Sequence, residues 1–122
     1  NPTGILRTAK AYENFVLDLE FMTAPGTNSG VIVYCSDIAN WIPNSVEVQI
    51  ADDFAEQWAK APATWHCGAV FGHLATTKSA VKKPGEWNHY TITCAGKRIT
   101  VVLNGVIGFY QDDTQRNVDS PP

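Results

Sequence analysis

One short segment of the chain carries a carboxylate and an amide at the spacing of a β-strand. Val46, Val48 and Ile50 alternate with Glu47 and Gln49, which is the period of a strand with one apolar face. Glu47 and Gln49 should then project from the opposite face, about 7 Å apart. A carboxylate in such a place can act as a general base. We predict Glu47 as a catalytic base and Gln49 as a substrate-binding residue, both partly exposed in a shallow groove. A solvated charge on an open sheet face is the alternative.

Three of the tryptophans fall in segments without strand alternation, at Trp41, Trp58 and Trp65. An exposed indole can stack on a sugar ring, although many loop tryptophans simply cover a core. We predict that Trp41 and Trp65 bind substrate and that at least one loop tryptophan lies within reach of Glu47. Trp87 is instead predicted to anchor the core.

Imidazole and carboxylate side chains could also hold a metal ion. His66, His73 and His89 could do so together with Asp52 or Asp53, and a divalent metal could stabilise negative charge that develops on a substrate oxygen. Their spacing matches no known ligand motif. No cofactor is therefore established from the sequence, and a divalent metal stays open.

Length, charge and cysteine content bound the function classes. The chain has 122 residues, is 44% hydrophobic and carries a formal net charge of -3. These values fit one domain without the basic stripe that nucleic acids require. No apolar run approaches the ~20 residues that span a bilayer, so no membrane span is expected. Cys35, Cys67 and Cys94 lack CxxC spacing. They are predicted as plain core or strand residues, with one disulfide and a leftover thiol as the alternative in an oxidising compartment.

Short strands must position these side chains. Alternation predicts one strand over 15–22, and the turn formers at 25–30 predict its hairpin with the apolar run 31–35. Further strands are expected over 45–50 and 67–72. Asp53 and Glu56 have the spacing of a capping box for a brief helix that ends by Pro62.

The clearest pattern lies in the last third of the chain. Alternating residues predict consecutive antiparallel strands over 87–94, 98–103 and 106–110. Asn104 and Gly105 supply the positive φ angles of a tight turn between the last two. Seven short strands in total, each with one apolar face, predict an all-β fold of the antiparallel β-sandwich type.

Five short motifs also resemble one known family. In chain order they are YENF (12–15), NSGV (28–31), VEVQI (46–50), GEWN (85–88) and LNG (103–105). Their order and spacing are similar to those of the 3-keto-disaccharide hydrolase domain family (DUF1080). The resemblance covers roughly residues 6–110. It implies a concanavalin-A-like jelly roll that acts on sugars oxidised at carbon 3.

The resemblance carries further expectations. In a 3-keto sugar, Glu47 could remove the acidified C2 proton and start elimination of the glycosidic substituent. Tyr34 stands where family members often have an Arg, and Tyr34 and Asn28 are predicted to bind substrate. Exported bacterial members imply an extracellular or periplasmic location. The alternative function is a non-catalytic carbohydrate-binding or structural module of a larger secreted assembly.

The resemblance also implies an incomplete sandwich. We expect residues 1–122 to be a single domain that is truncated at both ends. The strands over 15–22 and 106–110 should then have open edges, covered by missing segments of the same polypeptide or by neighbouring subunits.

Overall fold

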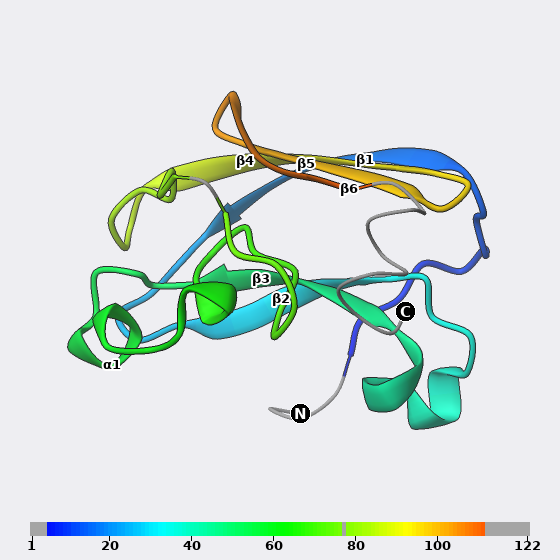
Figure 1. Cartoon of the computed structure of the whole chain (residues 1–122), viewed down its shortest axis with the longest axis horizontal. Helices are drawn as coiled ribbons and strands as arrows, with labels where there is room; N and C mark the ends of the chain where they lie inside the picture. Colours follow the sequence, from blue (N-terminus) through cyan, green and yellow to red (C-terminus); the bar gives the residue numbers. More distant parts are fainter. Residues whose placement is uncertain (1–4, 77, 112–122) are drawn as a thin grey trace.

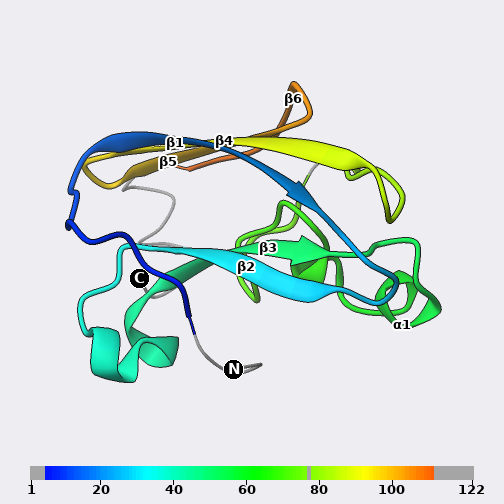
Figure 2. The same cartoon turned by 180° about the vertical axis from the view of Figure 1, so that it is seen from behind.

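The computed structural model describes residues 5–76 and 78–111. These residues form two β-sheets that face each other as layers (Figures 1 and 2). The strands are β1 (Phe15–Met22), β2 (Asn28–Val33), β3 (Val46–Ala51), β4 (Trp87–Ala95), β5 (Arg98–Leu103) and β6 (Val106–Gln111). The helical pieces are α1 (Glu56–Ala59) and three 3-10 turns, η1 (Ile38–Asn40), η2 (Ile42–Asn44) and η3 (Ala63–Trp65). The fold is therefore an all-β sandwich, as the sequence predicts.

The larger sheet has the strand order β1-β4-β5-β6. The predicted meander of β4, β5 and β6 is confirmed, and its second turn places Asn104 at φ 52° and Gly105 at φ 80°. The predicted hairpin of 15–22 with 31–35 is wrong. β1 pairs antiparallel with β4 instead, from Phe15↔Cys94 to Met22↔Trp87. Alternation identifies a strand, but it does not identify the strand's partner.

The smaller sheet consists of β2 and β3 in antiparallel register. The segment 67–72 is not a regular strand, contrary to the prediction. It meets β3 through the isolated bridge Val48↔Val70 and through backbone hydrogen bonds to Glu47 and Gln49. Gly68 and Gly72 adopt φ angles of 91° and 77°, and these left-handed values interrupt an extended chain. The segment still follows β3, because the Phe71 N–H donates to the Glu47 carbonyl at 2.9 Å.

The core lies between the two layers. Tyr90, Ile92 and Val101 are fully buried there, and each large apolar side chain contributes about 1.5–3 kcal/mol on burial. The Tyr90 hydroxyl joins the layers by donating to the Gln49 carbonyl at 2.5 Å. Trp87 is not an anchor of this core, contrary to the prediction. It is 60% exposed, because the residues of β4 that face inward are those that alternate with it.

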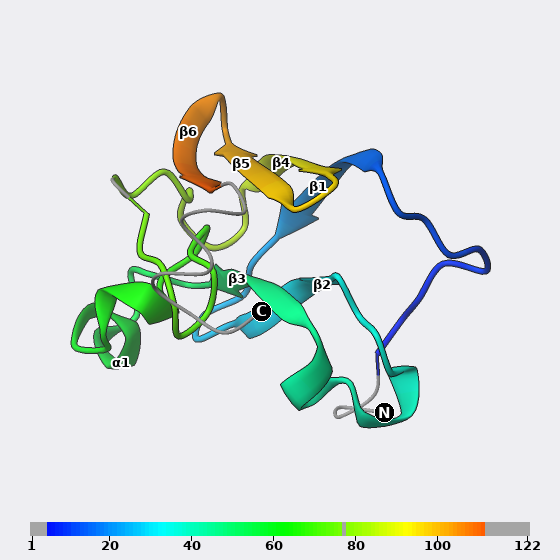
Figure 3. The ribbon, with the colours of Figure 1, turned by 45° about the vertical axis from the view of Figure 1, so that its right-hand side comes forward.

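Turns and loops close the ends of the smaller sheet. α1 and the β2–β3 loop with η1 and η2 lie at opposite ends of that sheet (Figure 3). The predicted capping box at Asp53 is wrong, since the N-cap of α1 is Ala55. The Asp53 carboxylate instead accepts a hydrogen bond from the Cys67 N–H at 3.0 Å. A local cap is thereby replaced by a contact that ties residues 53 and 67 together.

β1 and β6 are the outer strands of the larger sheet within the described ranges. The expectation that these edges are open, and are covered by other segments or subunits, stays a prediction. In the same ranges, no helix is long and apolar enough to cross a membrane.

Candidate functional site

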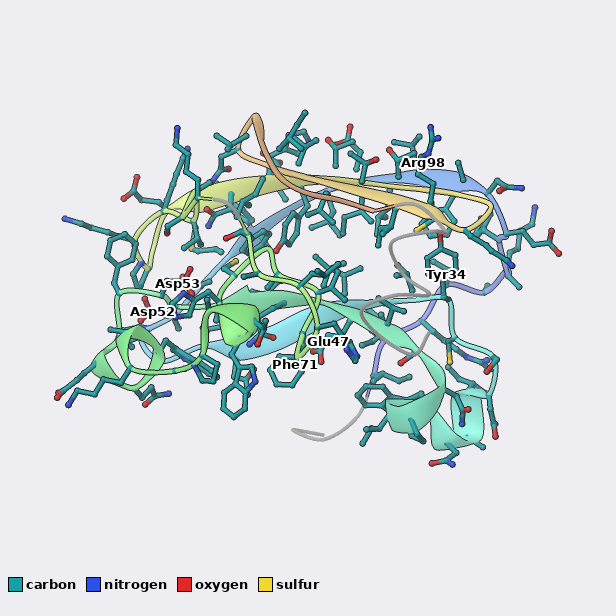
Figure 4. All side chains as sticks on the ribbon, viewed as in Figure 1. Tyr34, Glu47, Asp52, Asp53, Phe71 and Arg98 are labelled. Carbon is teal, nitrogen blue, oxygen red and sulfur yellow. The ribbon has the colours of Figure 1, made fainter. Side chains whose placement is uncertain are left out.

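The candidate site is the outer face of the β2–β3 sheet, which points away from the larger sheet. Val31 and Val33 pair with Val48 and Val46 on the inner face, and all four pack in or against the core. The alternate pairs must therefore face outward. They are Asn28↔Ala51, Gly30↔Gln49 and Ile32↔Glu47. Figure 4 shows Glu47 and Phe71 together on this side.

Glu47 is half-buried on this face, in agreement with the predicted partial exposure. Burial raises the pKa of its carboxyl above the ordinary value of 4.5, because a low-dielectric environment disfavours the charged form. Among residues 5–76 and 78–111, the structure gives this carboxylate no hydrogen bond or ion pair. Glu47 thus combines a raised pKa with free oxygen atoms, as a general base requires.

Gln49 is fully buried, contrary to the prediction that it is partly exposed. Its Nε2 donates to the Trp65 carbonyl at 3.0 Å and to Asn28 Oδ1 at 3.3 Å. The chain around η3 therefore covers this part of the sheet face. Gln49 links that chain to β2, and its amide hydrogens are occupied by protein acceptors. Its direct contact with substrate stays a prediction.

Aromatic rings border Glu47 on the side of the 67–72 segment. Trp65 stacks on Phe71 with ring centroids 5.5 Å apart and an interplanar angle of 25°. Trp65 remains 40% exposed, and the backbone of Phe71 is bonded to that of Glu47. Trp65 therefore contacts a neighbour of Glu47, and its reach to the Glu47 carboxylate stays a prediction. Phe71 is not among the predicted site residues, because it lies in the segment 67–72, for which only a strand was expected.

The other predicted substrate-binding residues are more dispersed. Asn28 is exposed on β2 and lies beside Gln49. Trp41 is half-buried in the loop between η1 and η2, where its carbonyl accepts from Ser45 Oγ at 2.7 Å. Tyr34 points into the space between the layers (Figure 4). Its hydroxyl contacts the carbonyls of Gly96 and Arg98 at 3.0 Å each. The structure therefore does not bring Tyr34 to the face that carries Glu47.

The predicted metal ligands do not gather. His89 contacts Asp18 on the outer face of the larger sheet, whereas His66 Nε2 lies 2.7 Å from the Trp58 carbonyl. Across the part of the chain that the structure describes, no group of three or more His, Cys, Asp and Glu side chains could hold a metal ion. The three histidines with Asp52 or Asp53 are therefore not a preformed metal site.

Asp52 and Asp53 have a structural role at the end of β3. Asp52 accepts hydrogen bonds from the N–H groups of Gly26 at 2.9 Å and Phe54 at 3.1 Å. Burial raises the pKa of Asp53, while the Cys67 N–H acts in the opposite direction. Together the two carboxylates fix the chain that enters α1 and the chain that leaves η3. Both side chains lie away from Glu47 (Figure 4).

Comparisons with known proteins agree with this architecture. A family model described as a 3-keto-alpha-glucoside-1,2-lyase-like domain matches residues 1–121. A crystal structure of a protein from Parabacteroides distasonis, provisionally named a glycosyl hydrolase, is 57% identical with a TM-score of 0.81. The match covers 83% of this chain and 52% of that one. This chain thus spans about half the length of that relative.

A second protein from Parabacteroides distasonis with the same provisional name is 21% identical. Its TM-score is 0.77, and the match covers 93% of this chain and 59% of that one. At this identity the likeness supports the fold alone. The search of curated proteins found no match.

Proposed function

The chain belongs to the 3-keto-alpha-glucoside-1,2-lyase-like family, and from this premise we propose that it eliminates the glycosidic substituent of 3-keto-glycosides. The ketone at carbon 3 acidifies the proton on carbon 2. Glu47 takes this proton, and the C2–H electron pair forms an enolate. The enolate then re-forms the C3 ketone and makes the C1=C2 double bond while the C1–O bond breaks, and the departing oxygen takes a proton from water or from protonated Glu47 and leaves as the alcohol. Addition of water across the double bond completes a net hydrolysis.

The observation that carries the proposal is the environment of Glu47. A base works best when its pKa lies near the operating pH, and burial moves the pKa of Glu47 in that direction. The described contacts leave its oxygen atoms available for a substrate proton. Glu20 on β1 is by contrast an exposed carboxylate on the outer face of the other sheet.

The neighbouring side chains support a sugar as the ligand. The exposed part of Trp65 offers an apolar surface to the C–H face of a pyranose ring. The exposed Asn28 side chain can hydrogen-bond a sugar hydroxyl. We expect this chemistry outside the cytoplasm, which is a further proposal about the protein's location.

The test uses an aryl 3-keto-α-glucoside and measures both release of the phenol and exchange of the C2 proton in deuterated water. Replacing Glu47 by Gln keeps the side-chain size and removes only the base. We expect Glu47→Gln to lower both rates by about 10²–10⁴-fold. Glu20→Gln is the matched control and should retain the wild-type rates. Equal turnover by wild type and Glu47→Gln would remove Glu47 from the mechanism.

A second function has one observation of its own in the 40% exposure of Trp65. A non-catalytic module would use this ring to bind sugar without changing it. In that case the wild type would bind 3-keto-glycosides without releasing the alcohol or exchanging the C2 proton. Trp65→Ala would then weaken binding measured by calorimetry. Turnover by the wild type excludes this function as the whole activity.

A further inference from the structure

Gly30 differs from most of the described glycines. Six glycines adopt positive φ angles that favour glycine over other residues: Gly26, Gly68, Gly72, Gly85, Gly96 and Gly105. Gly30 has no such backbone requirement and lies inside β2. Glycine in a strand interior weakens the strand, because it loses more chain entropy and has no side chain to pack. Its presence at this position needs another explanation.

The side chain of Glu47 supplies that explanation. A Cβ atom built on Gly30 would lie 2.7 Å from Cγ and 2.8 Å from Cδ of Glu47. It would also overlap with Oε2. Carbon atoms do not approach this closely without a shift. The Glu47 side chain therefore lies flat across the backbone of Gly30, in the space that any other residue would fill.

The register explains why this arrangement half-buries Glu47. Glu47 pairs with Ile32, so Gly30 is the diagonal neighbour on the same face. Lying over Gly30 keeps the carboxylate against the sheet rather than extended into water. The same contact leaves the oxygen atoms without a partner among the described side chains.

We propose that Gly30 is a positioning residue, whose missing side chain lets β2 hold the Glu47 carboxylate flat on the outer sheet face. The catalytic meaning of this position rests on the proposed function of Glu47. The geometry itself does not. The tests therefore include two measurements that need no activity.

The first test is a double-mutant cycle on stability. The effect of Gly30→Ala on the unfolding midpoint should be about 2–6 °C less favourable in the wild-type background than in the Glu47→Ala background, because only in the wild type must Glu47 leave its place. In the Glu47→Ala background the same change should be neutral or raise the midpoint, since alanine is the better strand residue there. Ser29→Ala, whose side chain faces the other way, should have the same effect in both backgrounds. Equal effects of Gly30→Ala in the two backgrounds would refute the proposal.

The second test follows the titration of Glu47 by NMR of its side-chain carboxyl carbon. In the wild type the pKa should lie above the ordinary 4.5 because of burial. In Gly30→Ala the displaced carboxylate becomes more exposed, so its pKa should fall toward that ordinary value. In Ser29→Ala it should match the wild type. An unchanged pKa in Gly30→Ala would refute the positioning role.

The third test separates this inference from the proposed reaction. Gly30→Ala should lower kcat for the aryl 3-keto-α-glucoside by at least about tenfold, with a smaller change in KM, because the base is misplaced. Full kcat in Gly30→Ala would contradict a positioning role in catalysis. If the wild type has no activity, the proposed function fails, while the stability cycle and the titration still decide whether Gly30 positions Glu47.

Discussion

Glu47 and Gln49 show how neighbouring positions on one strand face acquire different roles. Alternation placed both side chains outward, and the register with β2 agrees. Their burial differs, because the chain around η3 covers Gln49 and leaves Glu47 half-exposed. The sequence predicts on which sheet face the two side chains lie, but it does not predict which other segment buries one of them. Gln49 is buried by the segment whose Trp65 carbonyl it contacts, 16 residues away in the chain. Such a contact leaves no periodic pattern in the sequence.

The raised pKa of Glu47 predicts a pH-dependent stability. Above its ordinary pKa of 4.5, an unfolded Glu releases its proton while folded Glu47 retains it. The folded state then binds more protons, so the free energy of unfolding falls as pH rises from 4.5 through the folded-state pKa. Glu47→Gln should lose this part of the fall.

Urea unfolding of both proteins across this pH range checks that expectation. Asp53 also has a raised pKa and contributes a fall of the same sign in both proteins. The relevant quantity is therefore the difference between Glu47→Gln and wild type, which should favour the variant increasingly as pH rises. A difference that is constant with pH would show that burial does not shift the pKa of Glu47.

Tyr34 gives a second prediction at this scale. Its hydroxyl joins the β2 end to the β4–β5 turn through two carbonyl contacts at 3.0 Å. Tyr34→Phe should therefore lower the free energy of unfolding by about 1 kcal/mol, measured by urea unfolding. Tyr12→Phe is a suitable control, because Tyr12 is exposed, and its effect should stay within about 0.5 kcal/mol. Equal stabilities of Tyr34→Phe and wild type would contradict this structural role.

Among the elements, the meander was predictable because its signals are local. Asn104 and Gly105 specify the turn between β5 and β6, and each strand alternates clearly. The partner of β1 was not predictable in this way. β1 pairs with β4, although more than half of the chain separates the two strands in sequence. The alternation of apolar residues in β1 would fit pairing with either of two amphipathic strands. Long-range pairing is selected by packing against Ile92 and Cys94 in the core, which alternation does not encode.

The hydrogen bonds of the Asn104 side chain allow a prediction about the segments that they join. Asn104 Oδ1 accepts from the His89 N–H at 2.9 Å, and Nδ2 donates to the Ala80 carbonyl at 2.7 Å and to Asn88 at 2.9 Å. Asn104→Gly keeps the positive φ and loses these bonds, which should cost about 1–2 kcal/mol. Asn104→Ala also strains the turn and should cost about 1 kcal/mol more.

Chemical denaturation of the two Asn104 variants separates side-chain bonding from backbone strain. Amide hydrogen exchange should in addition show weaker protection around His89 and Lys82 in both variants. The Lys82 N–H donates to Asn88 Oδ1, so it depends on the same network. Wild-type stability of Asn104→Gly would show that the turn conformation alone holds these strands.

At the scale of the whole molecule, the two layers bury groups from distant parts of the chain in one core. Cys67 follows η3 beside the smaller sheet, and Cys94 lies on β4 of the larger sheet, yet both belong to the same buried cluster. Cys35 is exposed in the β2–β3 loop. All three thiols are free, so the disulfide alternative is not supported. The prediction that all three cysteines are core or strand residues is wrong for Cys35, which is exposed and lies outside the strands.

Thiol reactivity therefore measures whether the two layers close on each other. Burial raises the pKa of Cys67 to about 11 and also raises that of Cys94, and only the thiolate reacts rapidly with a disulfide reagent. We expect Ellman's reagent to modify one thiol per native chain rapidly, and all three in denaturant. Cys35→Ser should remove the rapid phase, and the slow phase should accelerate with urea as the layers separate. Rapid modification of Cys67 or Cys94 in the native protein would mean that the sandwich is open in solution, and Glu47 would then lack the supporting core that fixes its strand.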